Sequence, residues 1–333
     1  MQKRIISVIG IGSWGATMAQ YLSSLGHSIT GWHRNTAFIN QLKIIGKHPS
    51  VPNLRFNPDI ALTSNLNNIP KSDIVMLGIP SHAMKSICKK FRNQFKDTII
   101  VNLAKGIEND SLKRMSEIIN DEGDVKLDNI ITLSGPSHAE EVVKNIPTTV
   151  VAAGINQQSI ELIQDTFSSK TFRVYASTDI LGVELGGSVK NIIAIAAGIC
   201  DGIGFGDNTK SALITRGIVE IKRLGIKMGA VPETFAGLSG IGDLIATCLS
   251  SHSRNRFVGE EIGRGNKLTD ILEKMEVVAE GVNSTKSVYE LMQKNDVEMP
   301  ICSAIFSVLF MDEDPVVVVN RLMTRDLTYE IDS

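Results

Sequence analysis

The spacing Gly-x-Gly-x-x-Gly near the N-terminus constrains the fold of this chain more than any other part of its sequence. It lies between Ile5–Ile9, a β-branched run typical of a buried parallel strand, and residues 16–25, whose apolar spacing is that of a helix. Gly10 permits a tight turn, Gly12 lets the backbone approach a pyrophosphate, and Gly15 lets the helix pack closely on the strand. This context predicts a βαβ unit that binds a dinucleotide, in preference to a turn without a ligand.

The rest of the chain divides into an alternating half and a helical half. Further buried strands are predicted at residues 28–32, 74–79, 98–102, 130–133 and 148–152, with a helix at 83–95. Strands that alternate with helices predict a doubly wound parallel sheet of the Rossmann type. After about residue 179 the pattern is helical, at residues 181–200, 208–224, 254–262, 267–275, 284–294 and 303–310. We therefore expect an NAD(P)-binding α/β domain at 1–184 and an all-α domain at 185–333.

The composition excludes several classes of partner. A net charge of −2 gives no basic excess for nucleic acid and no polybasic run for a membrane surface. The longest uncharged apolar run, near residues 192–199, is too short to span a bilayer, so we expect no membrane insertion. The four cysteines are far apart and indicate reduced thiols in a cytoplasmic protein. The six histidines show no metal-ligand spacing, and we expect no metal.

The end of the second predicted strand bears on the choice of dinucleotide. Proteins that bind the non-phosphorylated cofactor carry a carboxylate there, on the ribose 2′-hydroxyl. This chain has His33 and Arg34 instead, and a guanidinium suits a 2′-phosphate. We expect NADP(H) to be preferred, with NAD(H) possible; the alternative is that Arg34 is a solvated surface residue.

Lys190 is the strongest catalytic candidate. It is the only charged residue between Glu184 and Asp201, in an otherwise apolar helix, and a buried lysine is rare unless it has a partner or a task. Gly186 and Gly187, one turn earlier on the same face, are expected to leave room for a ligand. Desolvation and nearby cations would lower the pKa of its ammonium group toward neutrality, where it can exchange a proton. The alternative is a lysine that extends to solvent at a helix edge.

Other candidates follow predicted strands or begin predicted helices. Lys105 follows the strand at 98–102, at the sheet edge where ligands bind, although an exposed loop lysine fits equally well. Ser137 and Glu140 have capping-box spacing, which favours a structural role. Ser253 suits a helix N-cap, and Arg254 adds a charged fork that can hold a small phosphate. A capped surface helix is the alternative for this last pair.

Taken together, the motifs resemble those of NAD(P)-dependent glycerol-3-phosphate dehydrogenases of the bacterial biosynthetic type. They occur in family order over nearly the whole chain: GIGSWG at 10–15, LAKG at 103–106, LSGPSHA at 133–139, ELGGSVKN at 184–191, GLSGIGD at 237–243, SRN at 253–255 and VAEG at 278–281. Ile11 stands where many relatives have alanine, and His33 where another basic residue is common.

The resemblance implies roles for individual residues. Lys190 would be the proton donor and acceptor. The substrate site would consist of Lys105, Gly135, Ser137, Lys190, Asp243, Ser253, Arg254 and Asn255. The cofactor site would consist of Gly10, Gly12, Ser13, Trp14, Gly15, His33, Arg34, Lys105, Ala139, Arg254, Val278 and Glu280.

The resemblance also implies a fold and an activity. The helical domain would be of the 6-phosphogluconate dehydrogenase-like type. The enzyme would reduce dihydroxyacetone phosphate to sn-glycerol 3-phosphate in the cytoplasm, as a homodimer, for phospholipid synthesis. Two alternatives remain at this point: an oxidoreductase of the same plan that acts on a hydroxy acid, and an NADP-sensing protein without catalysis. The first lacks a visible carboxylate-binding motif, and Lys190 argues against the second.

Overall fold

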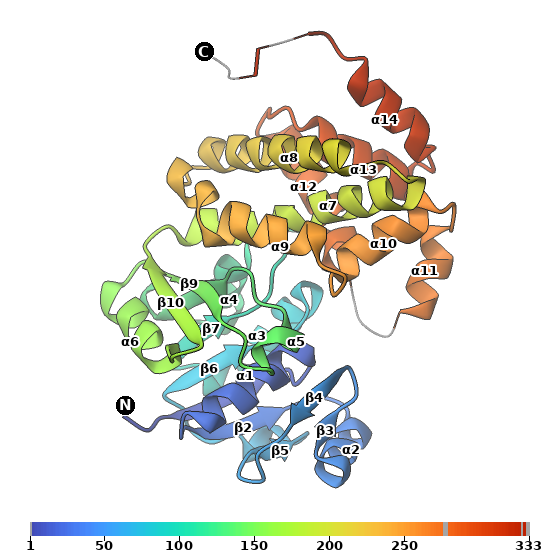
Figure 1. Ribbon diagram of the computed structural model, residues 1–333. Helices are drawn as coiled ribbons and strands as arrows, with labels where there is room; N and C mark the ends of the chain where they lie inside the picture. Colours follow the sequence, from blue (N-terminus) through green and yellow to red (C-terminus); the bar gives the residue numbers. More distant parts are fainter. Residues whose placement is uncertain (1, 276–278, 328, 331–333) are drawn as a thin grey trace.

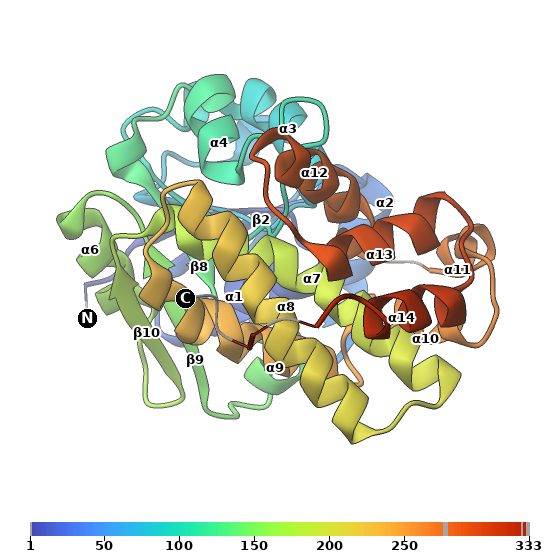
Figure 2. The ribbon, with the colours of Figure 1, turned by 90° about the horizontal axis from the view of Figure 1, so that it is seen from above.

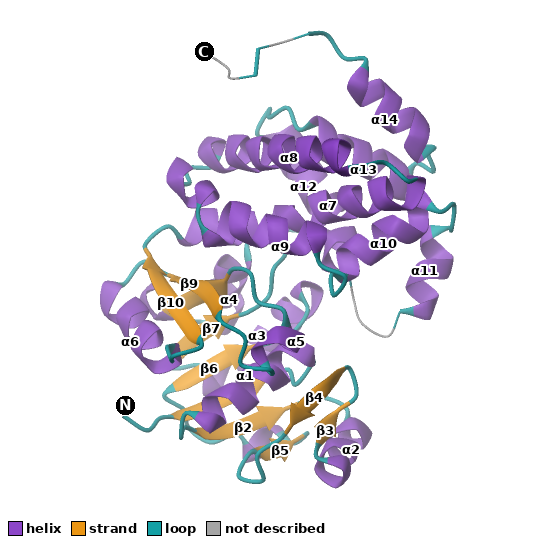
Figure 3. Ribbon diagram, viewed as in Figure 1, coloured by secondary structure: helices purple, strands orange, loops and turns teal. Residues whose placement is uncertain are grey.

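The chain folds into an α/β part and a helical part that lie against each other (Figure 1). The computed structural model describes residues 2–275, 279–327 and 329–330. Figure 3 shows the strands confined to the N-terminal part, with helices alone in the C-terminal part. This is the Rossmann-like and all-α architecture that the sequence predicts, and the fold class is confirmed.

One sheet forms the centre of the N-terminal part. In the described residues its eight strands are ordered β10-β9-β8-β7-β6-β1-β2-β5. Their bounds are β1 (Ile5–Ile9), β2 (Ser28–Trp32), β5 (Ala61–Thr63), β6 (Ile74–Leu77), β7 (Ile99–Asn102), β8 (Ile130–Ser134), β9 (Thr148–Ala153) and β10 (Phe172–Ser177). The helices here are α1 (Ser13–Ser24), α2 (Thr36–Ile45), α3 (Met84–Phe91), α4 (Met115–Gly123), α5 (Ala139–Val142) and α6 (Gln157–Phe167). A hairpin of β3 (Lys47–His48) and β4 (Val51–Arg55) lies outside the sheet.

The sheet is parallel, as predicted, except for one pairing near its edge. β8 pairs with β9 in the antiparallel sense, whereas β9 and β10 are parallel to each other. The reason lies in the connection between β8 and β9, which contains only the four-residue helix α5. A parallel return needs a crossover long enough to pass over the sheet, usually on a full helix. One helical turn cannot supply it, and the chain returns antiparallel.

Helix α7 (Ile180–Ile203) is the core of the C-terminal part. The other helices here are α8 (Asp207–Lys227), α9 (Asp243–Leu249), α10 (Arg254–Gly263), α11 (Leu268–Lys274), α12 (Glu280–Lys294), α13 (Pro300–Phe310) and α14 (Pro315–Met323). Seen from above, α8, α10, α12 and α13 surround α7 (Figure 2). By length and composition α7 could cross a membrane, but 89% of its most apolar window is buried inside the protein. The proposed domain division between residues 184 and 185 falls within this helix.

The contact between α7 and α10 depends on glycines. A Cβ added to Gly198 of α7 would lie 1.9 Å from the carbonyl oxygen of Arg256, and one added to Gly259 of α10 would lie 1.9 Å from that of Ile195. Gly202 and Gly263 repeat this arrangement one turn later. Because no side chain separates the two backbones, the helices pack closer than ordinary apolar side chains allow.

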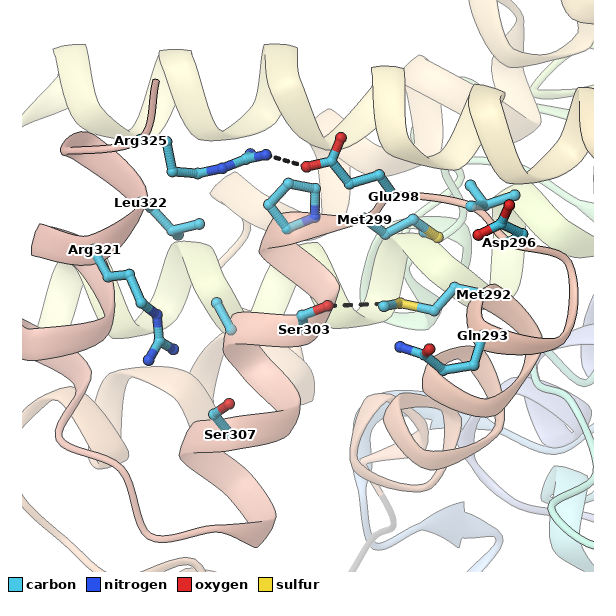
Figure 4. A pocket seen from close by; sticks show the side chains of 13 residues that line it. Met292, Gln293, Asp296, Glu298, Met299, Ser303, Ser307, Arg321, Leu322 and Arg325 are labelled. Atoms are coloured by element: carbon cyan, nitrogen blue, oxygen red, sulfur yellow. Dashed lines mark hydrogen bonds and ion pairs between the residues drawn. The ribbon is translucent and has the colours of Figure 1, made fainter. Parts of the chain in front are cut away.

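A groove of about 460 Å³ separates α14 from the ends of α12 and α13 (Figure 4). Both of its arginines are paired, Arg325 with Glu298 and Arg321 with Glu313, and Ser303 donates a hydrogen bond to the Met292 sulfur at 3.7 Å. None of the residues that the sequence analysis selected for substrate or cofactor lines it. The residues selected for substrate and cofactor gather instead where the two parts of the chain meet.

The glycine contact predicts a strong dependence of stability on Gly198. Gly198→Ala forces the α7 and α10 backbones apart and should lower the stability by about 3 kcal/mol or more, visible as a thermal midpoint roughly 5 °C lower or more. Gly206→Ala is the matched control, because a Cβ at Gly206 meets no atom within 4 Å. Equal midpoints for the two variants would contradict this account of the packing.

Candidate active site

The buried lysine of α7 lies at the interface of the two parts of the chain. Lys190 is only 4% exposed. Its Nζ donates to Asp243 Oδ1 at 2.5 Å and to Thr247 Oγ1 at 2.5 Å. Asp243 and Thr247 are one turn apart on α9, and the Thr247 hydroxyl donates in turn to the Asp243 carbonyl oxygen at 2.6 Å. An ammonium group has three donors, so these contacts hold Lys190 in place and leave a third donor for a ligand.

Asp243 also reaches the N-terminal part of the chain. Its Oδ2 accepts a hydrogen bond at 2.7 Å from Lys105, on the loop that follows β7. The Lys105 ammonium donates to the carbonyl oxygen of Gly135 as well, at 3.1 Å. One carboxylate therefore lies between two lysines from different domains. The structure brings together four of the residues that the resemblance selected for the substrate: Lys105, Gly135, Lys190 and Asp243.

The charges of this cluster act on each other. Burial lowers the pKa of Lys190 from 10.5 to about 8; Asp243 opposes the shift, and Lys105 adds to it. Burial alone would raise the pKa of Asp243, but Lys105 and Lys190 outweigh it and hold that pKa below its usual value. Asp243 is therefore a carboxylate at neutral pH, and Lys190 can gain or lose a proton near neutrality.

The glycines before Lys190 have a different use from the one expected. A Cβ on Gly186 would lie 2.6 Å from the carbonyl oxygen of Ser239, and one on Gly187 would lie 2.9 Å from Ser134 Oγ. The expectation that these glycines leave room for a ligand is wrong, since neighbouring chain already fills the space. Gly186 admits the segment before α9, which carries Asp243, and Gly187 admits the strand end of β8 and the side chain of Lys105, whose Cγ would lie 3.5 Å from the added Cβ.

The segment after β8 is shaped by Gly135. Its φ of +136° is in a region that side chains rarely adopt, and a Cβ there would lie 3.0 Å from Val150 Cα. The predicted capping box is wrong: α5 has His138 as its N-cap, and the Ser137 hydroxyl donates to the Gly135 carbonyl oxygen at 3.0 Å. Ala139, the first residue of α5, is buried. The sharp turn at Gly135 takes Ser137 out of capping position.

The start of α10 lies next to the lysine. Ser253 is the N-cap, as predicted, and its hydroxyl accepts the Arg256 N–H at 3.2 Å. Asn255 is buried; it donates to Asn191 Oδ1 at 2.9 Å and accepts from the Gly281 N–H at 2.9 Å. Arg254 stays exposed at the first turn, where the charges of Glu280 and Glu140 act on its guanidinium.

Glu280 begins α12 and reaches across to the other part of the chain. Its carboxylate accepts the Ser81 N–H at 3.2 Å and the Ser81 hydroxyl. Ser81 follows β6 at the carboxyl edge of the sheet, the edge where ligands of doubly wound folds lie. Val278, predicted beside Glu280, lies outside the described residues.

The glycine loop has the geometry that its spacing predicts. Gly10 has φ of +102°, and a Cβ there would lie 2.5 Å from the Gly78 carbonyl oxygen. A Cβ on Gly15 would lie 2.0 Å from the Gly10 carbonyl oxygen, whereas one on Gly12 would meet nothing. Gly12 is the N-cap of α1, with no side-chain cap, and Ser13 and Trp14 form its first turn. The first N–H groups of α1, which have no side-chain cap, thus begin beside a close-packed turn and next to the open space at Gly12.

At the end of β2 the two basic residues differ in their surroundings. His33 is half-buried; its Nδ1 accepts the Asn35 N–H at 3.2 Å, and its ring packs on Phe38. Burial, together with the neighbouring Arg34 charge, lowers the pKa of His33, although its contact with Asn35 opposes the shift. His33 is therefore neutral at pH 7, and Arg34, which is exposed, carries the positive charge at this position.

Three residues of the site were given no role from the sequence: Thr247, Ser81 and Glu184, although Ser81 follows a predicted strand at the edge where ligands bind. Thr247 could have been found, because it follows Asp243 by four residues on the same helical face. Glu184 is buried on α7 and accepts from Arg114 Nη1 at 2.8 Å and from the Ser116 N–H at 2.8 Å. It anchors α7 to the N-terminal part, and no local sequence pattern predicts partners that lie about 70 residues away in the chain.

Comparisons with known proteins agree on one family. Two family models match, NAD-dependent glycerol-3-phosphate dehydrogenase N-terminus at residues 5–160 and the C-terminus at residues 179–320. The chain is 48% identical to a glycerol-3-phosphate dehydrogenase of Thermoanaerobacter sp. (strain X514), over 98% of each chain. It is 45% identical to one of Salinibacter ruber, over 98% of this chain and 96% of the relative. The crystal structure of the Coxiella burnetii glycerol-3-phosphate dehydrogenase superposes with a TM-score of 0.92 at 34% identity, covering 97% of this chain and 99% of that one.

The charge cluster predicts how the titration of Lys190 responds to its neighbour. Lys105→Gln removes a positive charge, so the pKa of Lys190 should rise above its value of about 8. NMR titration of ¹³C-labelled lysine side chains, with Lys190→Arg for assignment, measures this shift. Lys113→Gln is the control, because Lys113 is exposed and pairs with Asp121. An unchanged or lower pKa in Lys105→Gln would show that the two ammonium groups do not interact.

Proposed function

The chain belongs to the NAD-dependent glycerol-3-phosphate dehydrogenase family, and we propose that Lys190 is the proton donor with which it reduces dihydroxyacetone phosphate to sn-glycerol 3-phosphate. The reaction is reversible, acts on a CH–OH group and uses NADP(H) or NAD(H). The observation that carries the role of Lys190 is its position, buried between Asp243 and Thr247 with a pKa of about 8. A buried lysine that titrates near neutrality suits proton exchange with an alcohol oxygen.

The N-terminal residues fit a dinucleotide. The turn at Gly10 and Gly15 admits no Cβ, while the space beside Gly12 is open, as the close approach of a pyrophosphate requires. The cofactor site would be formed by Gly10, Gly12, Ser13, Trp14, Gly15, His33, Arg34, Lys105, Ala139, Arg254, Val278 and Glu280. A nicotinamide held there supplies the hydride. Arg34 favours the phosphorylated form, because no carboxylate stands at the end of β2 to accept a ribose hydroxyl.

The start of α10 suits the substrate phosphate. The first N–H groups of a ten-residue helix carry partial positive charge, and Arg254 adds a full one at the same end. Lys105, Gly135, Ser137, Asp243, Ser253 and Asn255 would complete the substrate site around Lys190. Asn255 is held by Asn191 and by Gly281, so its place relative to Lys190 is fixed before substrate binds.

The proton step follows from the charges of the site. As the carbonyl carbon of the substrate is reduced, negative charge develops on its oxygen, and the Lys190 ammonium donates a hydrogen bond to that oxygen and then the proton. Asp243 and Thr247 orient the ammonium group. Lys105 keeps the pKa of Lys190 low enough for the proton to leave. In the reverse direction neutral Lys190 accepts the hydroxyl proton.

The physiological role that fits an enzyme of the biosynthetic type is to supply sn-glycerol 3-phosphate for phospholipid synthesis. The resemblance to this family supports a homodimer in the cytoplasm. A sensor of NADP without catalysis would have no use for a buried lysine of lowered pKa. Membership of a dehydrogenase family also favours an enzyme over a sensor.

Lys190→Ala should reduce turnover by about a hundredfold or more, because it removes the proton donor. NADPH binding, measured by fluorescence, should persist, since Lys190 is not among the cofactor residues. In the wild type, the rate of reduction should fall as the pH rises through about 8, where Lys190 loses its proton. Near-wild-type turnover of Lys190→Ala would exclude this role.

Arg34→Ala should raise the Michaelis constant for NADPH by about tenfold while leaving that for NADH nearly unchanged, because only the former carries the 2′-phosphate. Lys43→Ala is the control: Lys43 lies in the last turn of α2 on the same side of the fold and is given no cofactor role. Equal effects on NADPH and NADH would identify Arg34 as a solvated surface residue.

A further inference from the structure

Ser81 and Glu280 join two segments that are 199 residues apart. Ser81 is 3% exposed and lies on the loop after β6, while Glu280 is the first residue of α12. Both donors of Ser81, its N–H and its hydroxyl, point at the same carboxylate. Hydrogen bonds from two donors to one ionised acceptor are stronger than neutral ones and fix its orientation.

The surroundings are built to admit this pair. A Cβ on Gly106 would lie 2.6 Å from Ser81 Oγ and 3.3 Å from Glu280 Oε2, so a side chain at residue 106 would displace the hydroxyl. Two turns farther along α12, Ser287 donates to the Ile107 carbonyl oxygen at 3.0 Å. The same face of α12 therefore meets the loops after β6 and β7, and Ser81 holds Glu280, the first residue of α12.

We infer that Ser81 is a positioning residue, which holds the Glu280 carboxylate at the cofactor and beside Arg254. A carboxylate only accepts hydrogen bonds, and its two oxygens offer about four lone-pair sites. The two donors of Ser81 occupy two of these lone-pair sites. The remaining sites are then available to the Arg254 guanidinium, on which the Glu280 charge acts, and to N–H donors of a bound cofactor. This inference rests on the proposed cofactor role of Glu280.

Ser81→Ala tests the inference, because it removes the hydroxyl and keeps the backbone donor. The dissociation constant for NADPH, measured by fluorescence without substrate, should rise about tenfold. The Michaelis constant for NADPH should rise in parallel, while kcat at saturating NADPH changes less than about threefold. Ser86→Ala is the matched control: Ser86 is exposed on α3, and its hydroxyl donates only locally, to the Ala83 carbonyl oxygen at 3.0 Å.

Glu280→Gln separates failure of this inference from failure of the function that it rests on. An increased dissociation constant in Glu280→Gln together with a wild-type value in Ser81→Ala overturns the positioning role alone. Wild-type values in both overturn the cofactor role of Glu280 and the positioning role with it. A lower thermal midpoint of Ser81→Ala with unchanged NADPH binding would also overturn the inference, as it is the result of a purely structural hydrogen bond. In the double variant Ser81→Ala/Glu280→Gln the two effects should be less than additive.

Discussion

One buried carboxylate shared by two ammonium groups is the interaction on which this site depends. Burial lowers the pKa of an isolated lysine, because desolvation penalises its charged form. Asp243 opposes that loss for Lys190, and Lys105 limits how far Asp243 can do so. The three formal charges leave an excess of one positive charge at the place where an oxyanion would develop. The lowered pKa of Lys190 is therefore a balance between its burial and charged groups from both parts of the chain.

The contacts between the domains gather at the carboxyl edge of the sheet. The loop after β6 supplies Ser81, and the loop after β7 supplies Lys105. The Gly135 carbonyl oxygen, on the segment after β8, accepts from Lys105 and so helps to hold it in place. Glu184 anchors the beginning of α7 to the N-terminal part through Arg114. Since Ser81 and Lys105 join strand ends to α12 and α9 of the C-terminal part, the edge where a dinucleotide would bind is also the edge that meets the helices around Lys190.

The sequence predicts the features that arise from local patterns. β1 follows from its β-branched run and the turn at Gly10 from the glycine spacing, and Ser253 caps α10 as expected. Predictions failed where no local spacing of residue types decides the outcome. The direction of β9 depends on the length of the connection before it, and the use of Gly186 depends on the Ser239 backbone that packs against it. No spacing rule could pair residues such as Ser81 and Glu280.

The packing of α7 against α10 explains why the start of α10 lies beside Lys190 at all. The two helices run in the same direction and match at intervals of one turn. On α7 the matching positions are Asn191, Ile195 and Ile199; on α10 they are Asn255, Gly259 and Gly263. The two glycines fix this register, because each lies against a carbonyl oxygen of α7 and a shift by one residue would place side chains there.

With the register fixed, Asn255 must meet Asn191, the neighbour of Lys190 in the chain. The N-terminus of α10, with Arg254, is then held near Lys190 by the close backbone contact of the two helices together with the hydrogen bond from Asn255 to Asn191. The same glycines that look purely structural in the sequence thus set the distance between the proposed phosphate site and the proposed proton donor.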